Sequence, residues 1–489
     1  HLNSSLAQHR GGIDVRRGDL VLGNMATASL GTRSVTLLKP GRLIFESETD
    51  FSLTSQIRGP GDVIHQGQSV LTIDREAHLA DLTRLTVTGD GGSLIHRGKI
   101  SGVRALALDG QGDLEGDSTT LVAGWVALGQ KAGGHLELRD SAELTVSNPG
   151  QVIIGNGAQG TNTLTVSGGK MEFQSILLGN SPGSAGLIVQ RAGLVEKLAG
   201  DGSFDIGNSR NGRRDDWASF HLEGGRFLSD GTTNVGRYGN GSFFMRGGTC
   251  DLQAPLVIGK DRSSTGLADI GGGKLTITGD NSFLIVGDEG RAVVSIRGGG
   301  RVRCDTVLIG AGSPGRPGSG QLNILPDGEL TTTSIRQINR LQAKGELRLD
   351  GGTLRAMESG PDFVTGLDAF EVGPRGGTID TGEFEVAIGM PITGASGTGV
   401  TGIPVMNGGH GFQAPPVVKL GDGGHGASAV AEVTEGTVTS ITVTNPGRDY
   451  QTPPTVELVG SGNGFVAGTP TLAESPSGGL TKTGSGLLH

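Results

Sequence analysis

Charged and aromatic side chains gather in the loops that follow a series of glycine residues between positions 208 and 321. We call this set the charged edge. Its candidate binding residues are Arg210, Arg213, Arg214, Asp215, Asp216, Trp217, Arg237, Tyr238, Lys260, Arg262, Asp288, Glu289, Arg291 and Arg316. When Asp261 is included, eight cations stand against five acids, a local charge of +3 in a chain whose net charge is −9.

These residue types suit an anionic sugar polymer. A planar guanidinium group binds carboxylate or sulfate oxygens in a bidentate way, and an exposed aromatic ring can stack on the face of a sugar. The two longest loops, Asn208 to Ser219 and Ala311 to Gln321, occupy the same corner of the repeat. The pattern therefore predicts a shallow groove for an acidic glycan between them. The alternative is that long surface loops simply collect solvated charges.

The acids of the charged edge also leave an enzymatic alternative open. Two carboxylates about 5 to 9 Å apart can cleave a glycosidic bond, whereas a polysaccharide lyase needs a base beside a carbonyl group, often with Ca²⁺. Arg214 or Arg237 is assigned the role of the lyase base only by analogy. Adjacent acids such as Asp215 and Asp216 point to opposite sides of an extended segment. No catalytic residue is therefore assigned, and a polysaccharide lyase or glycoside hydrolase is the weaker alternative.

Other classes of site find no support in the sequence. The ten histidines are scattered, the two cysteines lie 54 residues apart, and no H-E-x-x-H or C-x-x-C spacing occurs, so neither a metal nor a cofactor is expected. The net negative charge argues against nucleic acid as a partner. No run of about 18 apolar residues exists, so no membrane span is expected in this chain.

The elements that position the charged edge repeat about every 26 residues. An apolar run ending in glycine recurs eight times, with its glycines at Gly129, Gly155, Gly179, Gly207, Gly236, Gly259, Gly287 and Gly310. The residue before each glycine is apolar, and so is the residue three positions before it in seven of the eight runs. This alternation is typical of a strand with one buried face. Glycine suits a tight corner that requires positive φ.

A second strand follows each corner, with inward pairs such as Leu164/Val166, Leu187/Val189 and Phe220/Leu222. Many units then carry two glycines and a short third strand. Units of this kind cannot bury their apolar faces alone, so each must stack on the next. The sequence predicts an all-β protein, a parallel β-helix or solenoid. Because Cys250 and Cys304 would lie two coils apart, about 10 Å, they are predicted to be free, buried thiols.

The repeat motifs carry a family resemblance. The segments 152–169, 57–73 and 478–487 resemble the repeats of bacterial autotransporter-like passenger proteins, the latter two the autotransporter-associated β-strand repeat. The resemblance implies export to the medium or to the bacterial cell surface. The membrane β-barrel of that family is not expected within this sequence.

The repeat pattern of the sequence changes beyond Gly389. The segment 409–420 is echoed 38 residues later by 447–458, which predicts a small duplicated β module inserted in the solenoid. The expected organisation is irregular coils or a cap over 1–120, regular repeats over 121–396, the module over 397–470, and a return to the repeat over 471–489. The last repeat is cut short, so the natural protein is expected to be longer.

The sequence thus favours a structural and adhesive function, that of a secreted or cell-surface passenger segment. Its expected partner is an acidic polysaccharide or a glycan of a host or other cell surface. A solenoid suits this role because its stability is a sum of local stacking terms. Besides the enzymatic alternative, a third is a self-assembling extracellular fibre, in which end coils associate head to tail through their edge strands.

Overall fold

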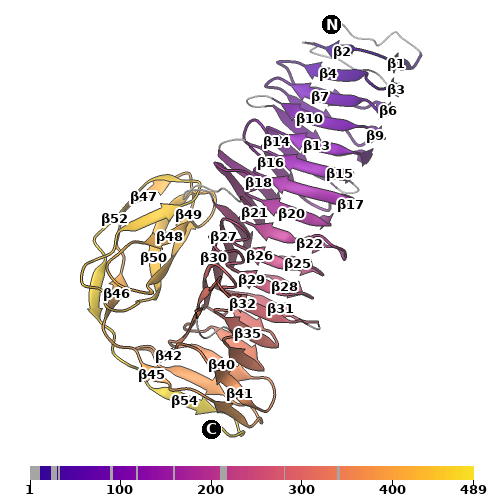
Figure 1. The fold of residues 1–489 in the computed structure, drawn as a ribbon. Coiled ribbons are helices and arrows are strands. Elements are labelled where there is room, and N and C mark those ends of the chain that lie inside the picture. Colours follow the sequence, from indigo (N-terminus) through magenta and orange to yellow (C-terminus); the bar gives the residue numbers. More distant parts are fainter. Residues whose placement is uncertain are drawn as a thin grey trace. The chain divides into compact units, whose positions relative to one another are not determined.

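The protein is all-β, and its strands wind into a parallel solenoid, as predicted (Figure 1). The structure is a computed structural model that describes residues 11–23, 30, 34–88, 92–116, 119–157, 160–209, 217–279, 281–338 and 342–489. Over these ranges it has 54 strands and no helix. A membrane-spanning helix is accordingly not found in the part of the chain that the structure describes.

A full turn of the solenoid contributes one strand, or one half of a long strand, to each of three parallel ladders. One turn, for example, consists of β19 (Lys170–Phe173), β20 (Ser175–Leu178) and β21 (Ser184–Gln190). We number the ladders 1, 2 and 3 in this order. Alternate residues point inward, so Met171 and Phe173 are fully buried while Lys170 and Glu172 remain partly exposed. Stacking like side chains turn upon turn gives the apolar interior that a single turn cannot form.

The chain divides into two compact units, of which the first comprises residues 1–204 and 224–228. Its ladder 1 contains β1 (Ile13–Val15), β3 (Ser34–Leu37), β6 (Gln56–Arg58), β9 (His78–Ala80), β12 (Lys99–Val103), the first halves of β15 (Thr120–Leu128) and β17 (Glu143–Ile154), β19, β22 (Leu194–Lys197) and most of β25 (Arg226–Ser229). Its ladder 2 contains β2 (Asp19–Leu22), β4 (Arg42–Glu46), β7 (Asp62–Gln66), β10 (Arg84–Thr88), β13 (Ala105–Leu108), the second halves of β15 and β17, and β20. Its ladder 3 contains β5 (Phe51–Leu53), β8 (Val70–Ile73), β11 (Ser93–His96), β14 (Gln111–Leu114), β16 (His135–Leu138), β18 (Gly160–Val166) and β21.

The second unit comprises residues 205–223 and 229–489 and holds the charged edge. Its ladder 1 contains β28 (Thr249–Leu252), β31 (Lys274–Ile277), β34 (Arg301–Arg303), β37 (Glu329–Thr332), β40 (Thr353–Ala356), β43 (Gly377–Asp380) and β54 (Leu480–Thr483). Its ladder 2 contains most of β23 (Phe204–Ile206), then β26 (Thr233–Val235), β29 (Leu256–Ile258), β32 (Phe283–Val286), β35 (Thr306–Ile309), β38 (Ser334–Arg336), β41 (Gly360–Thr365) and β44 (Val386–Ile388). Its ladder 3 contains β24 (Ala218–Leu222), β27 (Asn240–Met245), β30 (Thr265–Ile270), β33 (Arg291–Ile296), β36 (Ser319–Ile324), β39 (Lys344–Leu349), β42 (Ala369–Val372) and β45 (Thr393–Gly394).

The repeat glycines form the corners between ladders 2 and 3. All eight have φ between 62° and 78°, a region that residues with a Cβ atom rarely adopt. The corners are also crowded, because a Cβ atom added to Gly207 would lie 2.4 Å from the backbone oxygen of Asn240. Both the backbone conformation and the close approach of the neighbouring turn therefore require glycine here.

One predicted inward pair, Leu187/Val189, is wrong. The register places Ile188 beside Leu164 and Gln190 beside Val166, so Ile188 and Gln190 are the inward residues. Gln190 is fully buried, and its Nε2 donates hydrogen bonds to the backbone oxygens of Gly193 (3.3 Å) and Arg226 (2.8 Å). A one-residue shift reverses the faces of a strand, and an inward glutamine is tolerated here because its amide binds backbone carbonyls.

The predicted module near the C-terminus is antiparallel, in contrast to the solenoid. It contains the pairs β46 (Thr398–Gly402) with β53 (Thr471–Glu474) and β47 (Val405–His410) with β52 (Asn463–Ala467), and a sheet of β48 (Val417–Leu420), β49 (Ser428–Thr434), β50 (Thr437–Asn445) and β51 (Val456–Val459). The duplicated segments supply β48 and β51, which pair directly. After the module, β54 pairs in parallel with β43, so the chain re-enters ladder 1.

The two cysteines are free and buried, as predicted. Cys250 lies on β28, and Cys304 follows β34, the second strand beyond β28 in ladder 1. Burial raises the pKa of the Cys304 thiol to about 12 and that of Cys250 well above its ordinary value. Both thiols therefore remain protonated in the folded protein at neutral pH.

Candidate functional site

The charged edge consists of the loops that connect ladder 2 to ladder 3 in the second unit. Five of its predicted residues, Arg210, Arg213, Arg214, Asp215 and Asp216, lie outside the described residues. The other nine are described, and they fall on the corners of five successive turns. The prediction that these loops stack on one another is therefore met for the described part of the edge.

Two ion pairs between neighbouring turns neutralise much of the described edge. Lys260 pairs with Asp288, and each of these residues directly follows a repeat glycine. One turn further, the Arg316 guanidinium donates to Glu289 Oε2 over 3.1 Å, and Ser313 Oγ donates to Glu289 Oε1 over 2.8 Å. These contacts hold the loops against one another.

The ion pair with Arg316 also decides the protonation state of Glu289. Desolvation acts to raise the pKa of Glu289, but hydrogen bonds from Ser313 and Arg316 and the nearby positive charges lower it below its ordinary value. The carboxylate is therefore ionised at neutral pH. A glycosidase needs one carboxyl group that remains protonated as the general acid, and Glu289 does not meet that requirement.

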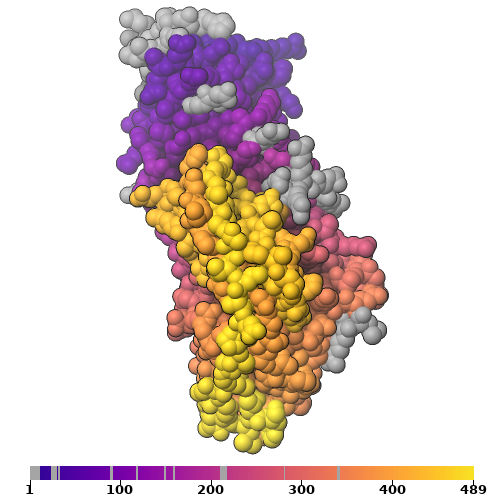
Figure 2. All heavy atoms as spheres, turned by 90° about the vertical axis from the view of Figure 1, so that its left-hand side faces the viewer, coloured from indigo at the N-terminus to yellow at the C-terminus, as the bar shows by residue number. Residues whose placement is uncertain are grey.

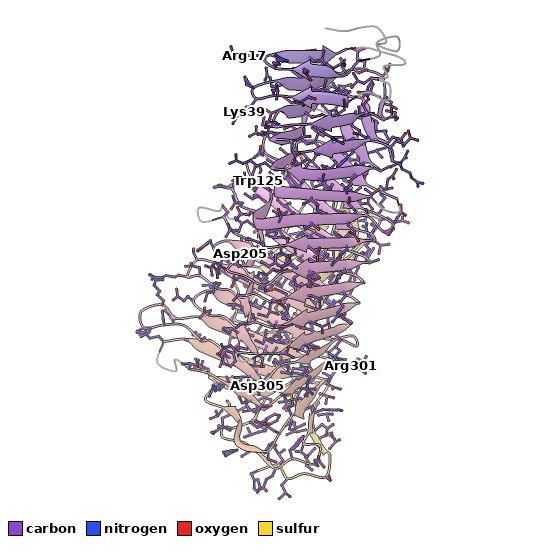
Figure 3. All side chains as sticks on the ribbon, turned by 90° about the vertical axis from the view of Figure 1, so that its right-hand side faces the viewer. Arg17, Lys39, Trp125, Asp205, Arg301 and Asp305 are labelled. Carbon is purple, nitrogen blue, oxygen red and sulfur yellow. The ribbon has the colours of Figure 1, made fainter. Side chains whose placement is uncertain are left out.

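Arg237 contacts a buried acid that sequence reasoning missed. Its Nε lies 4.0 Å from Oδ2 of Asp205, which is only 6% exposed and is labelled in Figure 3. The Asn234 amide donates to Oδ1 of the same carboxylate over 2.6 Å. The Arg237 guanidinium also lies 4.9 Å from the centre of the Tyr238 ring. This contact is local, because Arg237 and Tyr238 are adjacent in the chain.

Trp217 departs from the expected groove. The hypothesis requires an exposed ring on which a sugar can stack, but Trp217 is 8% exposed and faces the inserted module. Arg262 and Arg291, by contrast, are exposed and form no ion pair with any residue in the described ranges. These two arginines are therefore the exposed cations of the described edge whose charge is not neutralised by an acid in those ranges.

Within the second unit, the module lies against the outer face of ladder 3, a contact that the sequence analysis did not foresee (Figure 2). Its centre is an ionic cluster in which the Arg297 guanidinium donates two hydrogen bonds of 2.9 Å to the fully buried Asp269. Arg246 donates to Asp269 over 2.6 Å. From the module, the Glu432 carboxylate accepts from Arg297 over 2.6 Å and lies 3.5 Å from Arg246. Two arginines and two acids thus balance within one contact.

Further polar contacts extend along the same face. The Asn445 amide of the module donates to Asn323 Oδ1 over 3.2 Å, and both side chains are buried. The Gln321 amide donates to the backbone oxygen of Gly426 over 3.0 Å. Arg448 binds both Glu371 (3.0 Å) and Glu346 (3.3 Å). Together these contacts attach the module to three successive strands of ladder 3, namely β36, β39 and β42.

A serine and a histidine also meet beside this face. Ser219 Oγ lies 2.6 Å from His221 Nε2, and the imidazole stacks on Phe244 at 4.9 Å. Burial, followed by the charge of Arg246, lowers the pKa of His221 to about 3. A histidine that is buried and so weakly basic is a poor general base at neutral pH. The pair is therefore part of the packing and not a nucleophilic site.

Metal chemistry finds no support within the described ranges, which contain no cluster of three or more His, Cys, Asp or Glu side chains that could hold an ion. Comparison with known proteins adds no further constraint, because no protein-family model, curated protein or solved structure matches this chain. The function must accordingly be argued from the geometry alone.

Proposed function

We propose that this chain is a structural and adhesive segment, exported to the medium or to a bacterial cell surface, whose solenoid presents the antiparallel module. The observation that carries the proposal is the attachment of the module to the solenoid through Glu432, Asn445 and Arg448. Contacts of this kind fix one orientation of two packed surfaces where they are buried, as at Asp269 and Asn445. A module held in this way suits display, because its exposed strands keep a fixed direction.

The adhesive part of the proposal rests on Arg262 and Arg291. Both are exposed on neighbouring turns of the charged edge, and an arginine binds sulfate or carboxylate oxygens through two parallel hydrogen bonds. An acidic glycan that follows the edge would meet both in succession. The ligand class proposed is therefore a sulfated or uronate-containing polysaccharide, bound without cleavage.

The test measures binding and turnover in the same samples. The purified chain is incubated with immobilised sulfated and uronate polysaccharides, and retention is measured together with new reducing ends and ultraviolet absorbance. We expect retention that falls with salt and drops about tenfold in the double variant Arg262→Ala/Arg291→Ala, at roughly 0.5–1 kcal/mol for each exposed ion pair. The matched control is Arg301→Ala/Arg303→Ala, which removes two exposed arginines from β34 in ladder 1. Depolymerisation of any of the polysaccharides, or equal retention by both double variants, would contradict the proposal.

A further inference from the structure

A partly open, largely apolar cavity of about 120 Å³ lies between ladder 3 and the module, distinct from the ionic and amide contacts described above. Trp217, Leu267 and Val293 contribute to its wall on the solenoid side. Val417, Ala427 and Val459 contribute to its wall on the module side. All of these residues belong to the second unit.

The size and lining of the cavity determine what it can hold. Aliphatic and aromatic side chains predominate in the wall, and apolar cavities of about 150 Å³ in proteins stay dry and bind benzene. The wall also includes the polar residues Asn240, Thr265 and Ser428, which lie among the apolar side chains. A single six-membered ring or a hydrocarbon chain of similar volume is therefore the occupant that this space fits.

The solenoid places a cation beside the cavity. Arg291 and Val293 lie two residues apart on β33, so both side chains project from the same face, about 7 Å apart along the strand. Val293 lines the cavity, and the exposed Arg291 pairs in register with Thr265, which also lines it. Lys419 of the module also lines the cavity. Positive charge therefore borders an apolar cavity.

We propose that this cavity binds a small organic acid, with its ring or short hydrocarbon chain in the apolar space and its carboxylate on Arg291. This ligand differs from the glycan proposed above in class and in its apolar binding surface, whereas Arg291 is common to both proposals. Apolar burial supplies most of the affinity, and the charged hydrogen bond at the mouth selects the acid over its uncharged analogue.

The experiment uses benzoate and toluene as probes, which share a ring and differ in the carboxylate. The chain has two tryptophans, so Trp125→Phe leaves Trp217 as the single fluorophore, and Trp217 lies in the cavity wall. In this background we expect both probes to change the Trp217 emission saturably. Arg291→Gln is expected to weaken benzoate by about fivefold, the effect of one charged pair at a surface, and to leave toluene within about twofold. Val293→Phe, which fills the cavity, is expected to abolish binding of both probes.

Two further variants keep the outcome interpretable. Arg301→Gln removes an exposed charge from ladder 1 and should change neither probe. Ala427→Leu fills the cavity from the module side and should also abolish binding of both probes, while circular dichroism checks that each filling variant keeps its fold. Absence of saturable binding would overturn the cavity as a binding site, as would benzoate binding that survives both filling variants. Equal benzoate affinity with and without Arg291 would overturn the recognition of the acid. Loss of glycan retention in Arg262→Ala with benzoate binding intact would separate this site from the glycan site.

Discussion

Arg297 Nη2 and Glu432 Oε1 lie 2.6 Å apart, although 135 residues separate them in the chain. Burial acts to lower the pKa of Arg297, but the hydrogen bonds and charges of Asp269 and Glu432 outweigh it and raise the pKa above its ordinary value. The guanidinium is therefore held charged at the contact between solenoid and module. The contact depends on both acids, because each arginine must be balanced where water is scarce.

Glu432→Ala should loosen the module. The Glu432 side chain is 36% exposed, so screening by solvent limits the expected loss to about 1–2 kcal/mol. Asp269→Ala should cost about 3–5 kcal/mol, because it leaves two arginines beside a fully buried position. Thermal unfolding measures the stability change in each variant. Hydrogen exchange in β49 and β50 measures how far the module itself is loosened. Glu474→Ala, which removes an exposed acid of the same module, is the control. If Glu432→Ala behaves like this control, the ionic cluster does not hold the module.

Protonation of His221 should make the second unit sensitive to acid. The folded state keeps this imidazole neutral down to about pH 3, whereas the unfolded chain takes up a proton near pH 6.5. The unfolded state therefore binds more protons between these values, so the free energy of unfolding decreases as the pH falls below about 6.5. The loss from this group alone is about 2 kcal/mol between pH 7 and pH 5.

His221→Gln removes that titration and keeps a side chain able to bind Ser219 Oγ. Denaturant unfolding at pH 7 and pH 5 should therefore show a smaller loss of stability in the variant, by about 2 kcal/mol. His410→Gln, a change at an exposed histidine, should leave the loss as it is in the wild type. An equal loss in wild type and His221→Gln would show that His221 is not buried in its neutral form.

The sequence predicted the solenoid because each of its turns repeats the same physical requirements. Apolar residues before each glycine must face a common interior, and the glycine must occupy a left-handed corner, so both appear as a pattern about 26 residues long. The Lys260 and Asp288 pair was accessible to the same reasoning, because each residue follows a repeat glycine and the two therefore stack. Arg316 and Glu289 occupy loops of different length, so their pairing could not be read from the spacing.

The covered face of ladder 3 is the largest feature that the sequence analysis missed. Trp217 was expected at the surface because it lies in a long loop, yet a segment more than 200 residues later covers it. The sequence did contain a signal of this covered face. Phe244 on β27 and Leu267 on β30 are apolar residues at outward positions, where the alternation of apolar and polar residues predicts polar ones. Outward apolar residues indicate that a strand is covered, but they do not identify the covering segment.

The thiols of Cys250 and Cys304 should be unreactive in the folded protein. Both are buried with pKa values far above their ordinary range, and the thiolate is the form that reacts. Alkylation at pH 8, measured by mass spectrometry, should be at least about 10³-fold slower than in denaturant, because it requires local opening. Rapid labelling of either cysteine without denaturant would contradict the close stacking of the coils around β28 and β34.

Gly287→Ala should separate the two reasons for glycine at a corner. Gly287 has φ of 75°, and an added Cβ atom would lie 2.4 Å from the backbone carbonyl of Ser319 in the next turn. Gly315 has nearly the same φ, 77°, but nothing lies within 4 Å of its added Cβ atom. We expect Gly315→Ala to cost about 1–2 kcal/mol, the strain of left-handed backbone alone. Gly287→Ala should cost about 3 kcal/mol or more, because the turn must also move away from its neighbour.

The stacking of the turns is tested by the size of the stability loss in Gly287→Ala and also by which strands exchange faster. In a solenoid each turn contacts only its neighbours, so hydrogen exchange in Gly287→Ala should accelerate in β32, β33 and β36 and remain unchanged in β40 and β43. Gly315→Ala should produce a smaller acceleration near its own loop. Equal costs for the two variants would mean that backbone strain alone selects glycine. A uniform acceleration through the second unit would mean that its turns unfold as one cooperative block.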